Sequence, residues 1–103
     1  MIKAEEYKEF IISSLKEIMA VDSPTGFSGA VNRKLEEMLK EMGYRAQVTN
    51  KRLVKVSVAG RSHDKKIAVS AHVDTLGAMV MSVSADGKIR FTRLGGPILP
   101  TFD

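Results

Sequence analysis

A histidine and an aspartate lie two positions apart within the otherwise apolar stretch AVSAHVDTLGAMV, residues 68–80. A buried strand rarely carries two ionisable side chains unless they pair or bind something. On an extended backbone, residues two apart point to the same side, so His72 and Asp74 would face one site. A neutral imidazole is a common zinc ligand, and a nearby carboxylate can hold its other ring nitrogen. The pair therefore suits a metal site.

The same two residues also admit a structural interpretation. His72 would then be a buried, hydrogen-bonded histidine, and Asp74 would cap the following turn. One histidine and one aspartate do not complete a tetrahedral metal site, which normally needs at least three protein ligands. The other histidine, His63, lies in a polar loop beside Asp64 and Lys65, which is typical of a solvated surface residue. No serine has the Gly-x-Ser-x-Gly context of a nucleophile elbow.

Two helices are expected ahead of this stretch. Residues 4–20 carry apolar side chains at helical spacing, and the breaker-rich sequence DSPTG at 22–26 ends the pattern. A second helix follows with Ser28 as its N-cap and Gly43 as the left-handed residue that stops it. The apolar faces of the two helices are Tyr7, Phe10, Ile11, Leu15, Ile18 and Met19, and Val31, Leu35, Met38, Leu39 and Met42.

The pattern then changes to period two. Residues 46–49 and 53–59 alternate β-branched and polar side chains, which predicts two strands joined by a turn at Asn50-Lys51. The next segment, 67–71, is apolar on both faces, as in a central strand of an α/β sheet that is covered on both sides. Ligands gather outside the carboxyl ends of such strands, and this strand would deliver His72 there.

A further hairpin is expected after Gly77. Residues 78–83 and 88–94 read as strands, and Asp86-Gly87 between them is a strong two-residue turn signal. The last nine residues, GGPILPTFD, combine apolar side chains with two prolines and complete no element. We therefore expect the chain to stop within something larger.

Composition excludes several functional classes. The chain has 103 residues, no cysteine, 44% hydrophobic and 27% charged residues, and a net charge of +4. The length suits one small domain. The basic residues are scattered among acidic ones, so neither a basic stripe nor an aromatic platform for nucleic acid is present. Because no signal core and no membrane-length apolar run occurs, we expect a soluble, cytoplasmic protein without a membrane partner.

The segment SAHVDTLGAMV resembles the first metal-ligand motif of a family of co-catalytic metallo-aminopeptidases. This is the glutamyl or deblocking aminopeptidase family, which assembles into tetrahedral dodecamers. The matching positions are Ala71, His72, Asp74, Gly77 and residues 78–80. The turn at 22–26 is similar to the family's Ser-Pro-Ser-Gly-like turn, and DGKIRFTRLGG is similar to the strand pair that leads into its second domain.

The resemblance implies an α/β fold in two parts. Residues 1–75 would be the N-terminal part of a zinc-peptidase-like three-layer catalytic domain, with two helices flanking a mixed sheet. Residues 76–103 would begin an inserted β-rich dimerisation domain, here truncated. His72 would be a ligand of one of two divalent metal ions, zinc or cobalt, and Asp74 would orient the site. The family's other ligands and its catalytic glutamate have no counterpart in this sequence, so these 103 residues alone are expected to be inactive.

The implied function is that of an N-terminal portion of a two-metal aminopeptidase that removes N-terminal residues from peptides. The parent enzyme would be a homo-oligomer built from dimers, up to a dodecamer. One alternative is a related metallo-deacylase or carboxypeptidase with a similar His-x-Asp strand. Another is a non-catalytic binding or assembly module, which becomes the better interpretation if the natural chain ends at residue 103.

Overall fold

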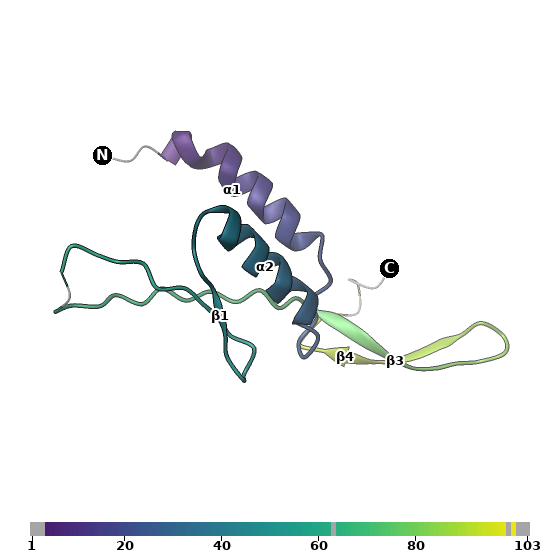
Figure 1. The fold of residues 1–103 in the computed structure, drawn as a ribbon. Coiled ribbons are helices and arrows are strands. Elements are labelled where there is room, and N and C mark those ends of the chain that lie inside the picture. The colour runs from purple at the N-terminus through teal and green to yellow at the C-terminus, as the bar shows by residue number, and fades with distance from the viewer. Residues whose placement is uncertain (1–3, 63, 99, 101–103) are drawn as a thin grey trace.

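The computed structural model describes residues 4–62, 64–98 and 100. Two helices precede two β-hairpins along the chain (Figure 1). The elements are α1 (Ala4–Met19), α2 (Gly29–Glu41), β1 (Gln47–Val48), β2 (Val54–Lys55), β3 (Gly77–Val83) and β4 (Ile89–Leu94). The predicted α/β class and the predicted order of helices and hairpins are therefore confirmed.

The end of α2 follows from the glycine that succeeds it. Gly43 has a φ of 83°, and its amide donates to the carbonyl of Lys40 at 2.9 Å. The next amide, that of Tyr44, donates to the carbonyl of Leu39 at 2.8 Å. These two bonds form a Schellman motif, which satisfies carbonyls that the helix leaves unpaired. Ser28 occupies the N-cap position as predicted, but it makes no side-chain capping hydrogen bond.

The helices lie on one side of the first hairpin rather than on both faces of a sheet. α1 packs against α2, and α2 contacts β2 (Figure 1). An ion pair of 2.7 Å between Lys34 Nζ and Glu17 Oε2 joins the two helices. Since both side chains remain partly exposed, this pair contributes little to stability. The expected arrangement of two helices flanking a mixed sheet is therefore absent from the described residues.

Within the described residues, each sheet has two strands. β1 pairs antiparallel with β2, and β3 pairs antiparallel with β4, with an irregularity between Val80 and Ser82. The turns at Asn50-Lys51 and Asp86-Gly87 lie where they were predicted, and Gly87 has the positive φ of 82° that its turn requires. The predicted strands 46–49 and 53–59 shorten to two residues each.

The prediction of a buried strand at 67–71 is wrong. These residues have no regular secondary structure, and Ile67 and Val69 are each 93% exposed. A strand needs a neighbour that accepts and donates backbone hydrogen bonds, and no described segment pairs with this one. The apolar pattern is present, but the surfaces that would cover it are not among the described residues.

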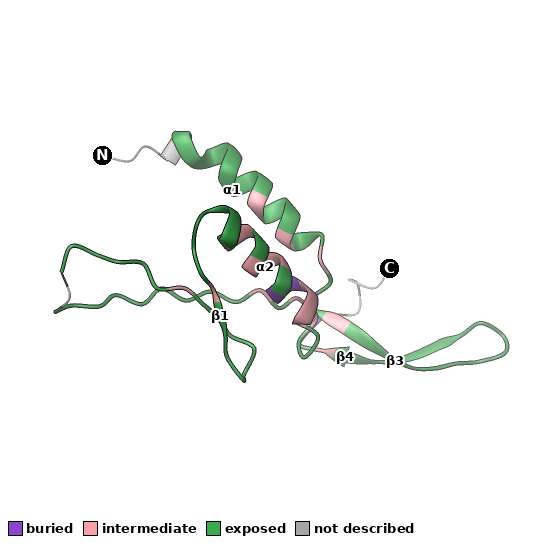
Figure 2. Ribbon diagram, viewed as in Figure 1, coloured by how far each residue is buried: buried purple, intermediate pink, exposed green. Residues whose placement is uncertain are grey.

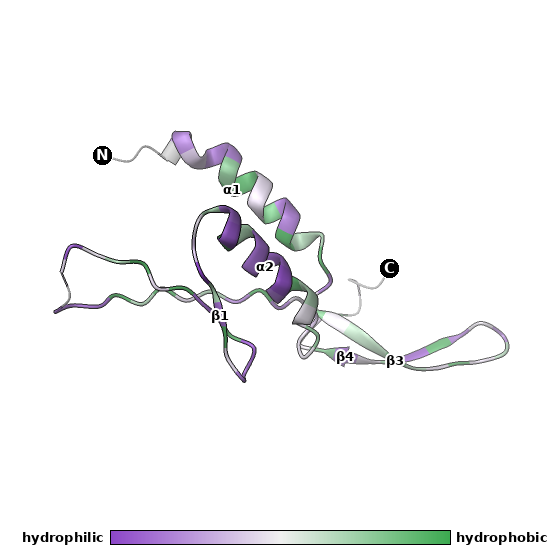
Figure 3. Ribbon diagram, viewed as in Figure 1, coloured by the Kyte–Doolittle hydropathy of each residue, from purple (hydrophilic) through white to green (hydrophobic). Residues whose placement is uncertain are grey.

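The buried interior is small. Val31 and Asn32 in α2, Ser23 in the turn before it, and Pro97 are the buried residues of the described chain (Figure 2). The radius of gyration is 18.3 Å, whereas a compact chain of this length has about 13 Å. The accessible surface is 9523 Å², against about 5,700 Å² for a compact monomer of this mass. Many apolar residues of the helices and hairpins are therefore exposed, and Figure 3 shows apolar stretches in elements that Figure 2 colours as exposed.

Within the described part of the chain, no helix is long and apolar enough to cross a membrane.

Candidate metal-ligand site

Two segments far apart in the sequence meet beside the start of α2. We call this contact the junction; it consists of the turn at residues 23–26 and the segment at 72–77. The amide of Thr75 donates to the carbonyl of Ser23 at 2.9 Å, and Pro24 and Thr75 form a parallel β-bridge. The Ser23 hydroxyl, which is buried, donates to the carbonyl of Val73 at 2.9 Å. Backbone and side chain of Ser23 thus hold both sides of Asp74.

Gly77 allows the junction to close. A Cβ atom at this position would lie 2.7 Å from Cβ of Pro24, which is closer than real Cβ contacts come. Any side chain at position 77 would therefore push the turn away from the segment. The glycine of the AHVDTLG motif is needed for this close approach, and β3 begins at the same residue.

The junction brings together three polar side chains. His72 Nδ1 lies 3.1 Å from Oδ1 of Asp74 and 3.1 Å from the Asp74 backbone carbonyl oxygen. The hydroxyl of Thr25 donates to Oδ2 of the same carboxylate at 2.9 Å. The side chains of His72 and Asp74 are 86% and 44% exposed. The ring is therefore neither buried nor part of a hydrophobic core, contrary to the structural interpretation of a buried histidine.

The hydrogen bonds determine which ring nitrogen of His72 carries the proton. Both partners of Nδ1, the carbonyl and the carboxylate oxygen of Asp74, are acceptors. Nδ1 must therefore be the donor, since a carbonyl and an ionised carboxylate have no proton to give. In the neutral ring this leaves the lone pair on Nε2, which is the electron pair that a metal ion would take.

The pKa of Asp74 lies below its ordinary value. The hydrogen bond from Thr25 is the largest cause, and the hydrogen bond from His72 adds to it, while desolvation opposes both. Donors to the carboxylate stabilise its charged form. Asp74 is therefore the anionic acceptor that the protonated Nδ1 requires.

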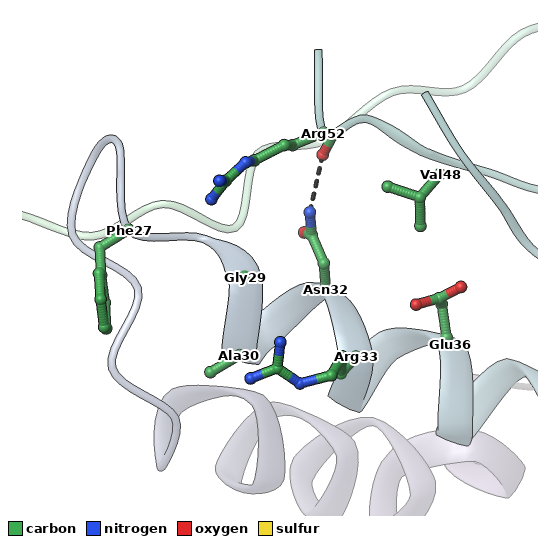
Figure 4. Close-up of a pocket in the computed structure, with 8 residues that line it drawn as sticks. All are labelled: Phe27, Gly29, Ala30, Asn32, Arg33, Glu36, Val48 and Arg52. Atoms are coloured by element: carbon green, nitrogen blue, oxygen red, sulfur yellow. Dashed lines mark hydrogen bonds between the residues drawn. The ribbon is translucent and has the colours of Figure 1, made fainter. Parts of the chain in front are cut away.

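A pocket of about 380 Å³ opens beside these side chains. Its lining includes Thr25, His72 and Asp74 from the junction, together with Arg52 from the first hairpin. A neighbouring pocket of about 510 Å³ lies between α2 and that hairpin (Figure 4). There the amide of Asn32, a buried side chain, donates to the carbonyl of Arg52 at 2.9 Å. This bond ties the hairpin to α2 at Arg52, whose φ is 61°.

The described residues do not form a complete metal site. Among them, no group of three or more histidine, cysteine, aspartate or glutamate side chains is placed to hold a metal ion. His72 offers one ligand atom, whereas a zinc site normally needs at least three protein ligands. His63, which was interpreted as a surface residue, lies outside the described residues.

The sequence identified two of the three side chains that are hydrogen-bonded around the Asp74 carboxylate. His72 and Asp74 were proposed from their spacing, and the structure brings their side chains into contact. The role of Thr25 was missed, because nothing in the sequence places residue 25 beside residue 74. The signal that could have found it is the resemblance itself, since the 22–26 turn and the 68–80 stretch both belong to the matched pattern.

The chain matches a known peptidase family and two curated relatives. Residues 52–102 match the family described as M42 glutamyl aminopeptidase. The chain is 35% identical over 82 residues to YhfE, a Bacillus subtilis protein assigned as an aminopeptidase, and this alignment covers 80% of the chain. It is 31% identical over 87 residues to the glutamyl aminopeptidase of Lactococcus lactis, across 84% of the chain.

The matches cover a limited part of those relatives. In both alignments the chain spans 24% of the relative's length. No solved structure gives a significant match to the chain. The family match includes His72, Asp74 and the whole second hairpin, which agrees with the resemblance seen in the sequence. Through residues 52–102, the chain belongs to the M42 glutamyl aminopeptidase family.

Proposed function

We propose that this chain is the N-terminal portion of a two-metal aminopeptidase and that His72 supplies one metal ligand through Nε2. One observation carries the proposal: Nδ1 of His72 is committed to two acceptors of Asp74, while the ring remains largely exposed at a pocket. An imidazole whose second nitrogen donates to a carboxylate is the usual arrangement of a metal-ligating histidine. Membership of the M42 family, which is generally a family of metallopeptidases, supports the same proposal.

Each residue of the junction has a defined part in this proposal. A divalent metal ion, when bound, would lower the pKa of a water molecule and polarise the scissile carbonyl. Asp74 would accept the Nδ1 proton in a hydrogen bond and so raise the basicity of Nε2. Ser23 and Gly77 would keep Asp74 beside the ring by holding the segment against the turn. The general base and the remaining ligands would come from residues other than those described here.

We also propose the more detailed features that the family resemblance implies. They are the division into a catalytic part at 1–75 and an inserted β-rich part at 76–103, and the use of zinc or cobalt. The homo-oligomeric parent, the peptide substrate and the cytoplasmic location belong with them. The second hairpin, β3–β4, begins at Gly77, the last residue of the junction, which is consistent with a change of structural unit near residue 76.

Metal analysis of the natural gene product tests the proposal. We expect the purified protein to hold divalent metal and to hydrolyse chromogenic amino-acid anilides, and His72→Ala to lose both properties. His63→Ala is the matched control, because it removes the other histidine of the chain and leaves His72 in place. Unchanged metal stoichiometry and activity in His72→Ala would contradict the proposal.

A non-catalytic binding or assembly module is the second candidate. It is favoured by the fact that the described residues contain no set of three metal-ligating side chains. The mass of the natural product separates the two: a product near 11.3 kDa supports the module, and one several times larger supports the enzyme. A deacylase or carboxypeptidase would be recognised by its preference for acylated or C-terminal substrates, and both relatives named above are called aminopeptidases.

A further inference from the structure

We propose that Thr25 is a positioning residue for His72. Its hydroxyl holds the Asp74 carboxylate in one orientation, and the carboxylate in turn holds the imidazole with Nδ1 protonated and Nε2 available. The inference rests on the proposed function for its purpose, since it explains how the ligand atom is presented. Its geometry, however, exists in the metal-free chain and is tested there.

The carboxylate of Asp74 has two oxygens, and each has its own donor. Oδ2 accepts from the Thr25 hydroxyl at 2.9 Å, and Oδ1 accepts from His72 Nδ1 at 3.1 Å. The terminal torsion of an aspartate is broad and two-fold, so one donor alone leaves the carboxylate free to swing. A second donor on another segment restricts that rotation. Thr25 supplies it from a position 49 residues before Asp74 in the sequence. The bond to His72 alone would let ring and carboxylate move together.

The donor is attached to a turn that is itself fixed. The Phe27 amide donates to the Pro24 carbonyl at 2.7 Å, and Gly26 between them has a φ of 88° that favours glycine. Ser23 bonds to the segment on either side of Asp74, at Val73 and at Thr75. Threonine is β-branched and stiff at χ1, so its hydroxyl has few directions to choose from. The hydroxyl therefore reaches Asp74 from a defined position.

Exposure explains why a tethered donor matters here. Asp74 is 44% exposed and His72 is 86% exposed, so water competes for both oxygens and both ring nitrogens. A hydroxyl already fixed in place binds the carboxylate without the entropy loss of ordering a water molecule. Thr25, His72 and Asp74 also line the same pocket, so the orientation that Thr25 imposes is the one presented to a ligand there.

The experiment measures the tautomer of His72 by long-range proton–nitrogen NMR on the metal-free, nitrogen-15-labelled chain. It is recorded at about pH 8, where an ordinary histidine is neutral. We expect the wild-type ring to be protonated at Nδ1. Thr25→Val keeps the β-branched shape but removes the hydroxyl, and we expect it to give a mixture of the two tautomers. Thr25→Ser restores the hydroxyl and should restore the Nδ1-protonated form.

Hydrogen exchange of the Thr75 amide separates positioning from a purely structural role. This amide donates to Ser23 and reports whether the junction is intact. A tautomer change in Thr25→Val with the Thr75 amide still protected supports the proposal, and so does rescue by Thr25→Ser. A wild-type ring protonated at Nε2 would overturn it without reference to any variant. The proposal would also be overturned if the tautomer is unchanged in Thr25→Val. The same holds if Thr25→Ser gives a mixture of tautomers while its Thr75 amide remains protected.

Zinc titration of the natural gene product carrying Thr25→Val or Asp74→Ala distinguishes this inference from the proposed function. Removing an outer partner of a metal-bound histidine typically weakens metal affinity by about 10–100-fold. We expect Asp74→Ala to fall in that range and Thr25→Val, one step further from the ring, to lose no more than about 10-fold. If the tautomer responds to Thr25 but the natural protein holds no metal, the positioning role stands and the proposed function fails. If metal binds at His72 and the tautomer ignores Thr25, the reverse holds.

Discussion

The junction is held by contacts with other parts of the chain, whereas the segment just before it is exposed. We call residues 60–71, of which residue 63 is not described, the open segment; all of its described residues are exposed. It makes no hydrogen bond to another described element, whereas the junction that follows is held by backbone, side-chain and close steric contacts. The open segment carries the more strand-like pattern, IAVSA, yet only the junction is ordered by its neighbours.

The difference lies in what each stretch meets. A β-branched apolar run gains stability only when another surface covers it, and a fully buried valine or isoleucine contributes about 1.5–3 kcal/mol through this effect. Ile67 and Val69 are 93% exposed and gain none of this stabilisation. In the junction, Ser23 and Thr75 satisfy one another's backbone groups, so order there does not depend on an apolar partner.

The largest expected change in the free energy of unfolding comes from comparing a buried valine with an exposed one. Val31 in α2 is fully buried, and Val69 in the open segment is 93% exposed. We expect Val31→Ala to lower the free energy of unfolding by about 2 kcal/mol, through lost burial and a residual cavity. Val69→Ala should stay within about 0.5 kcal/mol of the parent. Urea titration followed by helical circular dichroism measures both, and equal effects would show that the open segment is covered in solution.

The next largest change in the free energy of unfolding should come from replacing a glycine of the junction, with a glycine of the open segment as the comparison. In Gly77→Ala the new methyl group would meet Pro24 at 2.7 Å, and we expect a loss of about 1–2 kcal/mol as the turn shifts. In Gly60→Ala the new methyl group would lie 3.8 Å from the Ser62 carbonyl oxygen, an ordinary contact distance, and the effect should be within about 0.5 kcal/mol. Faster hydrogen exchange of the Thr75 amide in the first variant alone is the expected signature. Protection of that amide in Gly77→Ala would argue against the close approach.

The sequence predicted the local elements better than their assembly. The helix stop at Gly43 and the turn at Asp86-Gly87 follow from single residues whose backbone preferences act locally. The buried strand at 67–71 and the two-sided sheet depend on partners that periodicity does not reveal, and both predictions fail for the described residues. An apolar run shows that a surface needs covering and does not show what covers it.

In the candidate site too, the sequence revealed the residues that are close along the chain and missed those brought together by folding. His72 and Asp74 were found because a two-residue spacing places their side chains together on an extended backbone. Thr25 could not be found by spacing, since it is 49 residues from its partner and their contact depends on how the chain folds back on α2. Ser23 was interpreted as part of a turn and rejected as a nucleophile, and its hydrogen bond to the Val73 carbonyl was not foreseen.

A serine pair should give a smaller effect than the glycine pair. Ser23→Ala leaves the Val73 carbonyl without its donor in a partly buried setting, and we expect the free energy of unfolding to fall by about 1 kcal/mol. Ser70→Ala alters an exposed residue of the open segment and should be neutral within about 0.5 kcal/mol. Unfolding in urea measures the difference. If Ser70→Ala costs as much as Ser23→Ala, the contrast between the two regions does not hold.

The smallest effect should be a loosening of the junction in acid. Because the folded-state pKa of Asp74 is lowered, chiefly by the hydrogen bond from Thr25 and then by that from His72, its ionised form stabilises the folded junction. This contribution is complete above the unfolded pKa of about 3.9 and is lost as the pH falls through the lower folded value. Hydrogen exchange of the Thr75 amide in the metal-free chain should therefore accelerate in that range beyond its intrinsic pH dependence, and the amides of the open segment should show no such excess. Asp74→Asn removes the titrating group, so the excess acceleration should disappear in that variant. If it persists there, another group is responsible for the acid response of the junction.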